Sequence, residues 1–376
     1  MNSVAVAALL NAGALIASCA AAGLIALLVS RFLAAGNALP DAANDRSSHR
    51  GAAQRAGGAA IFVGWLAALG GLAIVGEAGL APRLAALAAL AFAFGLVDDW
   101  RGLAASWKFL GQTAVAAGFV VAFGGLASAP VPFVGDVALG ALGPAVTVFW
   151  IVAFMNAYNF MDGLNGVAAG CGVVALGAFA VATTLFGAGG PTDATVAALT
   201  LGAALAGFGA VNVMSGRFFM GDGGSQFISF AIAGLAVLAA SGAGGGRALT
   251  PLFLPTAFAP FLADVAFTLV HRLARGRNVV SAHREHVYQL LNRFGRSHAA
   301  VAGLYLALTA LSCVVALAFA AAPPALHWLG PIGLAAAFTP AGLWAYGRAT
   351  RLGLLAGAGE VAREGRLAGR RVAAAE

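Results

Sequence analysis

Charged residues are scarce in this chain. Only 9% of its 376 residues are charged, whereas 61% are hydrophobic. A soluble domain carries about a quarter charged residues, so this composition excludes an ordinary water-soluble globular protein. It also excludes a disordered chain, which would be polar or strongly charged. The apolar runs are long and do not alternate with polar residues, which argues against a membrane β-barrel. We therefore predict an all-α fold, a polytopic bundle of membrane helices, in which the 52 glycines favour close helix packing.

Cysteine and lysine are also rare. The three cysteines, Cys19, Cys171 and Cys313, lie in apolar segments. Their odd number and the lack of a Cys-x-x-Cys spacing argue against a disulfide framework or a zinc site. Lys108 is the only lysine among 21 basic residues. The net charge of +7 would suggest a nucleic-acid partner in a soluble protein. In a membrane protein the placement of the charges is more informative, and we predict no nucleic-acid partner.

Charge-free segments predict the membrane spans, because a helix needs about 20 apolar residues to cross the hydrocarbon layer. Residues 1–30 have no charge, and we interpret them as an uncleaved span, since a cleaved signal peptide starts basic and has a shorter core. Further spans are predicted over 56–76, 84–97, 109–135, 137–161, 163–192, 194–216, 223–246, 248–263 and 297–347, the last divided at Pro323-Pro324. The total is about eleven (10–11) transmembrane helices.

The basic residues predict the orientation of these spans. With the N-terminus outside, 19 of the 21 basic residues fall in cytoplasmic segments and only Arg83 and Arg247 lie outside. This agrees with the excess of Lys and Arg found in cytoplasmic loops. Residues 1–346 would then form one integral-membrane catalytic domain, and 347–376 a basic cytoplasmic tail. The Pro- and Gly-containing segment 129–143 predicts a small hairpin on the outer side.

Several of the 14 acidic residues lie at the ends of apolar segments or inside them. Asp98-Asp99 ends one such segment, Asp162 lies in NAYNFMDGLNG, Asp222 in FMGDGGSQF and Asp264 in PFLADVAFTLV. An Asp within a span costs about 2.5–3.5 kcal/mol, so an intramembrane carboxylate is a candidate for function. The predicted orientation brings all these carboxylates toward the cytoplasmic face.

Carboxylates that gather at one membrane face suggest Mg²⁺, which takes one or two carboxylates and completes its shell with substrate phosphates. The arginine-rich loop 272–298 lies on the same face and could bind phosphates. The glycines beside Asp222 let backbone approach a ligand closely. Together these features indicate phosphoryl transfer. Each also has a structural explanation: a helix-end pair, a turn, a glycine loop, or interface histidines at His283 and His286.

Five motifs occur in an order that is typical of one family. They are DAANDRSSHRGAAQRAGG, GLVDDW followed by Lys108 and Gln112, NAYNFMDGLNG, FMGDGGSQF and HREHVYQLLNRFG. Over roughly residues 40–300 the chain resembles the polyprenyl-phosphate N-acetylhexosamine-1-phosphate transferases, glycosyltransferase family 4. This family includes the phospho-MurNAc-pentapeptide translocase and the undecaprenyl-phosphate GlcNAc-1-phosphate transferases.

The histidine loop departs from the family pattern. Many members have His-x-His-His, whereas here these positions are His286, Tyr288 and Gln289. Any role that needs the second or third histidine is therefore not transferred to this chain. The HVYQLL form resembles the branch that starts O-antigen and capsule synthesis more than the peptidoglycan translocase.

The resemblance implies a reaction in a bacterial inner membrane, with the site facing the cytoplasm. A UDP-N-acetylhexosamine would donate its sugar 1-phosphate to undecaprenyl phosphate, and UMP would leave. This step begins O-antigen (lipopolysaccharide) or other cell-envelope polysaccharide synthesis. The resemblance also favours a homodimer, and it implies Mg²⁺, with Mn²⁺ as a substitute.

The resemblance further implies roles for individual residues. The catalytic residues would be Asp98, Asp99, Asp162 and Asp222, with Asp98 as the candidate base and Asp222 and Asp162 as the metal ligands. Substrate and phosphate groups would be bound by Lys108, Asn156, Asn159, Gly221, Asp264, His283, Arg284 and His286.

Other classes stay open from sequence alone. A secondary transporter would also have intramembrane carboxylates such as Asp264, although transporters place such groups near the midplane and often show internal repeats. A structural membrane protein would leave the carboxylates at helix ends unexplained. Within the enzyme class, a peptidoglycan-type phospho-MurNAc-pentapeptide transferase is the alternative. The sugar, whether GlcNAc, FucNAc, QuiNAc or another, depends on pocket contacts that discriminate single hydroxyls.

Overall fold

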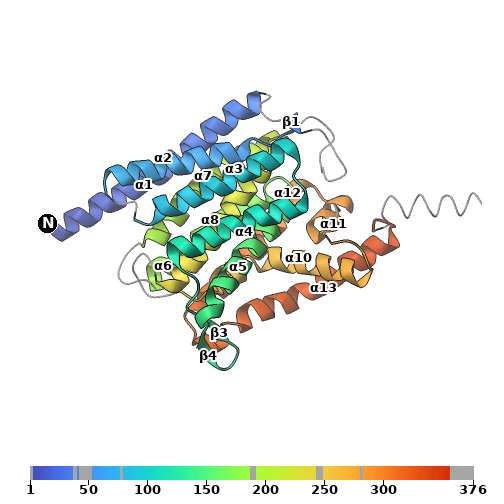
Figure 1. Ribbon diagram of the computed structural model, residues 1–376. Coiled ribbons are helices and arrows are strands. Elements are labelled where there is room, and N and C mark those ends of the chain that lie inside the picture. Colours follow the sequence, from blue (N-terminus) through green and yellow to red (C-terminus); the bar gives the residue numbers. More distant parts are fainter. Residues whose placement is uncertain are drawn as a thin grey trace, which may run out of the picture.

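Helices dominate the computed structural model, which describes residues 3–36, 40–41, 53–76, 79–186, 192–242, 249–279 and 283–355 (Figure 1). The α-helices are α1 Ser3–Ala35, α2 Gly57–Ile74, α3 Ala81–Arg101, α4 Ala105–Phe123, α5 Gly143–Phe160, α6 Val167–Phe186, α7 Asp193–Ser215, α8 Gly221–Ser241, α9 Phe253–Ala257, α10 Ala259–Ala274, α11 Val287–Arg293, α12 His298–Ala320 and α13 Leu329–Arg351. Two short 3₁₀ turns are η1 Gly140–Leu142 and η2 Pro324–Leu326.

The predicted all-α membrane bundle is confirmed. Within the described residues, 8 helices are long and apolar enough to cross a membrane: α1, α2, α3, α5 with η1, α6, α7, α8 and α12. Helices α4, α10 and α13 lie in the other ranges predicted to span, and α10 has only 16 residues. The predicted total of about eleven crossing helices therefore stays a prediction.

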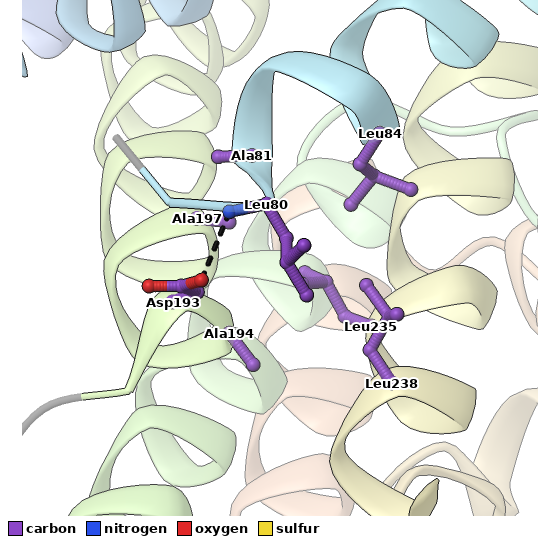
Figure 2. Close-up of a pocket in the computed structure, with 8 residues that line it drawn as sticks. All are labelled: Leu80, Ala81, Leu84, Asp193, Ala194, Ala197, Leu235 and Leu238. Carbon is purple, nitrogen blue, oxygen red and sulfur yellow. Dashed lines mark hydrogen bonds between the residues drawn. The ribbon is translucent and has the colours of Figure 1, made fainter. Parts of the chain in front are cut away.

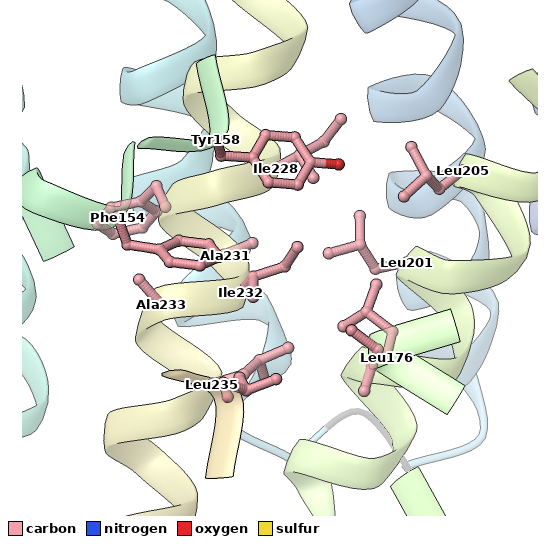
Figure 3. Packing of buried hydrophobic residues seen from close by; sticks show 14 of the residues in the cluster. Phe154, Tyr158, Leu176, Leu201, Leu205, Ile228, Ala231, Ile232, Ala233 and Leu235 are labelled. Carbon is pink, nitrogen blue, oxygen red and sulfur yellow. The ribbon is translucent and has the colours of Figure 1, made fainter. Parts of the chain in front are cut away.

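Helix α8 forms the centre of the bundle. It contacts α2, α3, α5 and α7, and 94% of its apolar 18-residue stretch is buried. A helix that is hydrophobic on all sides is expected in such a central place. Figure 3 shows Ile228 and Ile232 of α8 between the aromatic rings of α5 and the leucines of α6 and α7. This packing fixes the position of the polar N-terminal turn of α8.

The predicted hairpin forms within 129–143 and slightly before it. Strand β3 Ser128–Val131 pairs antiparallel with β4 Gly135–Ala138 (Figure 1), and both strands contact η2. The indole N–H of Trp328 donates to the Pro130 carbonyl at 2.6 Å. The break predicted at Pro323-Pro324 is also confirmed, because α12 ends at Ala320 and α13 starts at Leu329.

The predicted continuous span over 248–263 is wrong. The chain forms the short helix α9 and then α10, which continues to Ala274. Pro260 has no backbone N–H and is accommodated in the first turn of a helix, so a new helix starts at Ala259. The extended α10 carries Asp264.

A small apolar hollow lies at the far ends of α3 and α8 (Figure 2). Leucines and alanines line most of it, and Asp193 at the start of α7 accepts a hydrogen bond from the backbone N–H of Leu80 at 2.9 Å. The carboxylate thus caps the N-terminus of α3. Along the helix axes, Asp98 of α3 and Asp222 of α8 lie about 20–27 Å from the residues that line it, so this hollow is separate from the candidate site.

Candidate active site

Polar ends of four helices meet around one lysine. Asp98 lies in the last turn of α3, Lys108 in the first turn of α4 and Asp222 in the first turn of α8. The Lys108 ammonium forms ion pairs with the carboxylates of Asp98 and Asp222, at 3.4 Å for Asp222. From the end of α5, the Asn159 amide donates to Asp222 at 2.8 Å and to the Ser225 hydroxyl at 2.7 Å. Two of the sequence-predicted site residues, Lys108 and Asn159, therefore contact Asp222 directly, and a third, Asp98, contacts Lys108.

The turn between α3 and α4 places Lys108 opposite Asp98. Gly102 ends α3 in the left-handed conformation, with φ +63°, which glycine adopts without strain. The N–H of Leu103 donates to Asp98 at 2.9 Å and fixes this turn. The Lys108 and Asp222 side chains keep 27% and 25% of their surface exposed, while Asp98 keeps 2%. A ligand can therefore reach the lysine and Asp222 directly.

The two members of the aspartate pair face different partners. The Asp99 side chain is 1% exposed and accepts hydrogen bonds from the backbone N–H groups of Asp222 at 3.0 Å and Gly223 at 2.9 Å. These donors belong to the start of α8, where a helix has unpaired N–H groups and a partial positive charge. Asp99 therefore holds the turn that carries Asp222, whereas Asp98 faces the lysine.

The first polar loop is joined to the start of α8 by backbone hydrogen bonds. Residues 54, 57 and 58 bond to residues 217, 219 and 220 at 2.8–2.9 Å. Gly58 lies against Gly224 so closely that a Cβ on either would collide with the other backbone. Gly221 has φ +72°, and a Cβ there would lie 2.5 Å from the Arg55 carbonyl oxygen. The glycines of both motifs are thus required for contact between the two segments.

This contact brings Arg55 to the acidic cluster, with its guanidinium 3.7 Å from Asp99. Arg55 was not among the predicted site residues. The sequence feature that could have indicated Arg55 is its position directly before Ala-Gly-Gly in the first loop motif. The short strands β1 Pro40–Asp41 and β2 Ala53–Gln54 pair across this loop, and the RSSH part of the motif lies outside the described residues.

Asp162 lies in the turn between α5 and α6, three residues after Asn159. Burial, together with the negative charges of Asp222 and Asp99, raises the pKa of the Asp162 carboxyl well above its ordinary value. Because the neighbouring carboxylates disfavour the charged form of Asp162, a bound cation would stabilise that form. Asp162 therefore belongs to the same electrostatic cluster.

Asp264 lies in α10, apart from this cluster, and anchors the histidine loop. Its carboxylate accepts from the N–H groups of Val287 at 2.8 Å and Tyr288 at 3.0 Å, and from the Tyr305 hydroxyl at 2.5 Å. Nδ1 of His286 lies 3.2 Å from the same carboxylate and 3.2 Å from the Thr268 hydroxyl. Asp264 thus orients the His286 ring and the start of α11.

The two residues that replace family histidines have structural partners. Tyr288 is fully buried and donates its hydroxyl proton to the Phe160 carbonyl at the end of α5, at 2.8 Å. Gln289 accepts from the His286 N–H at 3.4 Å. The histidine loop is therefore tied to the turn that carries Asp162.

The remaining predicted residues occupy nearby but different positions. The rings of His283 and His286 are 5.0 Å apart, centre to centre, and the Arg284 carbonyl accepts from Arg293 at 3.2 Å. Asn156 lies one turn inside the bundle from Asn159 and contacts Gln112 rather than the charged residues. The structure thus places Asn156 behind the cluster.

The carboxylates of this site fit a magnesium ion whose coordination shell is completed by substrate oxygens. Within the described residues, no group of three or more His, Cys, Asp or Glu side chains is arranged to hold a metal ion by itself. Mg²⁺ commonly binds through one or two carboxylates plus phosphate oxygens. Asp222, with a partly exposed carboxylate, and Asp162, whose charged form a cation would favour, would supply that number.

Comparison with known proteins identifies the family of the chain. Residues 82–240 match the model of glycosyl transferase family 4. A probable undecaprenyl-phosphate N-acetylglucosaminyl 1-phosphate transferase of Bacillus subtilis (strain 168) is 31% identical over 263 residues, which is 69% of this chain and 71% of the relative. The chain belongs to glycosyl transferase family 4. The family assignment predicted from the five motifs is therefore confirmed.

Other members of glycosyl transferase family 4 are similar to parts of the chain. A decaprenyl-phosphate N-acetylglucosaminephosphotransferase of Mycobacterium tuberculosis (strain ATCC 25618 / H37Rv) is 32% identical over 293 residues, 68% of this chain and 69% of the relative. A phospho-N-acetylmuramoyl-pentapeptide-transferase of Synechococcus sp. (strain JA-2-3B'a(2-13)) is 38% identical over 168 residues, 41% of this chain and 47% of the relative. The chain is thus a multi-pass membrane member of this transferase family.

Proposed function

We propose that this chain transfers an N-acetylhexosamine 1-phosphate from a UDP-sugar to undecaprenyl phosphate, releasing UMP. The observation that carries the proposal is the contact of Lys108 with both Asp98 and Asp222 at polar helix ends of an apolar bundle. The lipid tail of the acceptor must stay in hydrocarbon while its phosphate meets a water-soluble nucleotide. A charged site at the ends of membrane helices satisfies both requirements.

In the reaction, an oxygen of the acceptor phosphate forms a bond to the sugar-bearing phosphorus of the donor. The bond from that phosphorus to the bridging oxygen breaks, and the oxygen leaves with UMP. The acceptor is a phosphate monoester with a second pKa near 6, so it is largely dianionic at neutral pH. Asp98 therefore orients Lys108 and the nucleophile without having to remove a proton.

The side chains around Asp222 position the phosphates. Lys108 supplies a positive charge between the two carboxylates, and Asn159 fixes the orientation of Asp222. Asp222 and Asp162 would hold Mg²⁺, which when bound neutralises charge on the diphosphate. From the histidine loop, His286 and Arg284 would contact the donor phosphates.

The proposed setting is a bacterial inner membrane with the site on the cytoplasmic face, at the first step of O-antigen or another envelope polysaccharide. The excess of arginine in the loops on that face supports the orientation. Tyr288 and Gln289 in the histidine loop favour this branch over the peptidoglycan type. Membership of a transferase family argues against the transporter alternative. A homodimer stays a prediction.

The test is UMP release by detergent-purified protein that is given undecaprenyl phosphate. The donors would be UDP-GlcNAc, UDP-linked 6-deoxy-N-acetylhexosamines and UDP-MurNAc-pentapeptide, each with Mg²⁺ and then with EDTA. We expect metal- and lipid-dependent release with one of the N-acetylhexosamine donors. Release with UDP-MurNAc-pentapeptide alone would show the peptidoglycan-type reaction. No release with any donor from folded protein would refute the proposal.

A further inference from the structure

A second layer of polar side chains lies one helical turn further into the bundle than the charged site. The same three helices contribute to both layers, with one residue of each layer on every helix. The charged layer is Lys108 on α4, Asn159 on α5 and Asp222 on α8; the amide layer is Gln112 on α4, Asn156 on α5 and Gln226 on α8.

The amide layer is connected across all three helices. The amide of Gln112 donates to Gln226 at 3.0 Å, and the amide of Asn156 donates to the Gln112 oxygen at 2.7 Å. Gln112 is 2% exposed and Gln226 is 4% exposed. The Asn156 amide also donates to the Val152 carbonyl of its own helix at 2.8 Å. Each link between side chains joins two different helices.

The spacing of the two layers ties them together mechanically. Residues three or four apart lie on one face of a helix, about 5–6 Å along its axis. A shift of α4 or α8 that changed the charged layer would therefore also break hydrogen bonds in the amide layer. Apolar side chains at these positions would not define the relative height of the helices, because their contacts are not directional. Charged side chains there would be far more costly inside the bundle.

We propose that the amide layer is a positioning device that fixes the relative heights of α4, α5 and α8. It thereby sets the spacing of Lys108, Asn159 and Asp222 that the substrate phosphates require. Gln112 and Gln226 are then positioning residues that act through the charged layer and do not touch the reacting atoms. The proposal rests on the proposed function, and it names the residues that keep that site in register.

The first experiment needs no substrate, because Lys108 is the only lysine. Acylation of Lys108 by an amine-reactive reagent, followed by mass spectrometry, reports how tightly the charged layer holds its ammonium group. In Gln112→Leu and Gln226→Leu we expect the acylation rate to rise about threefold or more, the shift that loss of one typical intramembrane hydrogen bond produces. Asp222→Asn, which removes an ion-pair partner, serves as the positive control.

The matched control breaks a similar hydrogen bond away from the site. The hydroxyls of Thr183 in α6 and Thr195 in α7 are buried and 2.8 Å apart. Thr195→Val should lower the thermal unfolding midpoint as the amide-layer variants do, but leave Lys108 acylation and UMP release unchanged. Equal acylation in the wild type and both glutamine variants would overturn the proposal. So would an effect of Thr195→Val as large as theirs.

The second experiment measures kinetics and rescue. We expect each glutamine variant to lower kcat about 10- to 100-fold, the effect of misplacing catalytic groups by around an ångström, with little change in KM. The exchange of Gln112→Asn together with Asn156→Gln keeps the paired amides and should recover part of kcat. An exchange variant as impaired as the single variants would overturn the proposal. If the wild type releases no UMP, the proposed function fails, while Lys108 acylation still decides the role of the amide layer.

Discussion

Removal of the Asp99 carboxylate tests whether the two members of the aspartate pair have different roles. In Asp99→Ala, the backbone N–H groups of Asp222 and Gly223 lose their acceptor at the part-buried start of α8. In Asp98→Ala, Lys108 loses one of two carboxylate partners at a partly exposed position. We expect the first change to act mainly on stability and on the position of Asp222, and the second mainly on activity.

The magnitude follows from the contacts that are lost. Loss of a helix N-cap costs about 0.5–2 kcal/mol, and a buried donor without a partner costs about 1–3 kcal/mol. With two donors affected, we expect Asp99→Ala to lower the free energy of unfolding by about 2–4 kcal/mol. For Asp98→Ala we expect about 1–2 kcal/mol, because Lys108 keeps Asp222 and is near water, while the Leu103 N–H loses its acceptor in the turn after α3.

The assay is thermal unfolding in detergent, run beside UMP release. Asp193→Ala is the matched control, since Asp193 also accepts from a helix N-terminus but lies at the other end of the bundle. It should lower the unfolding midpoint and leave the specific activity of the folded protein intact. Asp99→Ala should lower both, and Asp98→Ala should lower activity far more than the midpoint. An unfolding midpoint for Asp99→Ala equal to that of the wild type would refute the capping role.

Three further predictions concern neighbouring contacts. Asp222→Asn should insert and fold normally but lose UMP release at least about 100-fold; near-normal activity would contradict its assignment as a metal ligand. Tyr288→Phe should lower the free energy of unfolding by about 1–3 kcal/mol, because the carbonyl that ends α5 loses a buried donor; hydrogen exchange of the histidine loop that stays unchanged would oppose this. Gly58→Ala should prevent stable folding because its Cβ would collide with Gly224, whereas Gly70→Ala, with nothing within 4 Å, should be tolerated in expression and thermal-shift tests.

Hydropathy predicted most of the bundle because the energetic cost of charge in hydrocarbon is a local property of the sequence. The break at Pro323-Pro324 and the short hairpin followed from local backbone rules in the same way. The separation of α9 from α10 was missed, although Pro260 marks it. The residues around Pro260 are all apolar, so the segment was interpreted as one continuous span and the helix start at the proline was overlooked.

The acidic residues of the site were predicted for a related reason: carboxylates at helix ends need an explanation. Their individual partners depend on contacts between distant segments. Asp99 binds backbone groups more than 120 positions later in the chain, and Asp264 is surrounded by donors from α11 and α12. Such pairings follow from the packing of helices rather than from local sequence. For the same reason Arg55 and Gln226 were not recognised.

The enclosed position of α8 has a consequence for how the protein responds to its membrane. In α8, 94% of the apolar 18-residue stretch is buried, whereas in α1 the buried share is 17%. Changes in bilayer thickness or lateral pressure act on surfaces that touch lipid, and α8 presents almost none. Such forces reach Asp222 only after being spread over the surrounding ring of helices. The reaction centre is thus mechanically insulated from the lipid phase that delivers one of its proposed substrates.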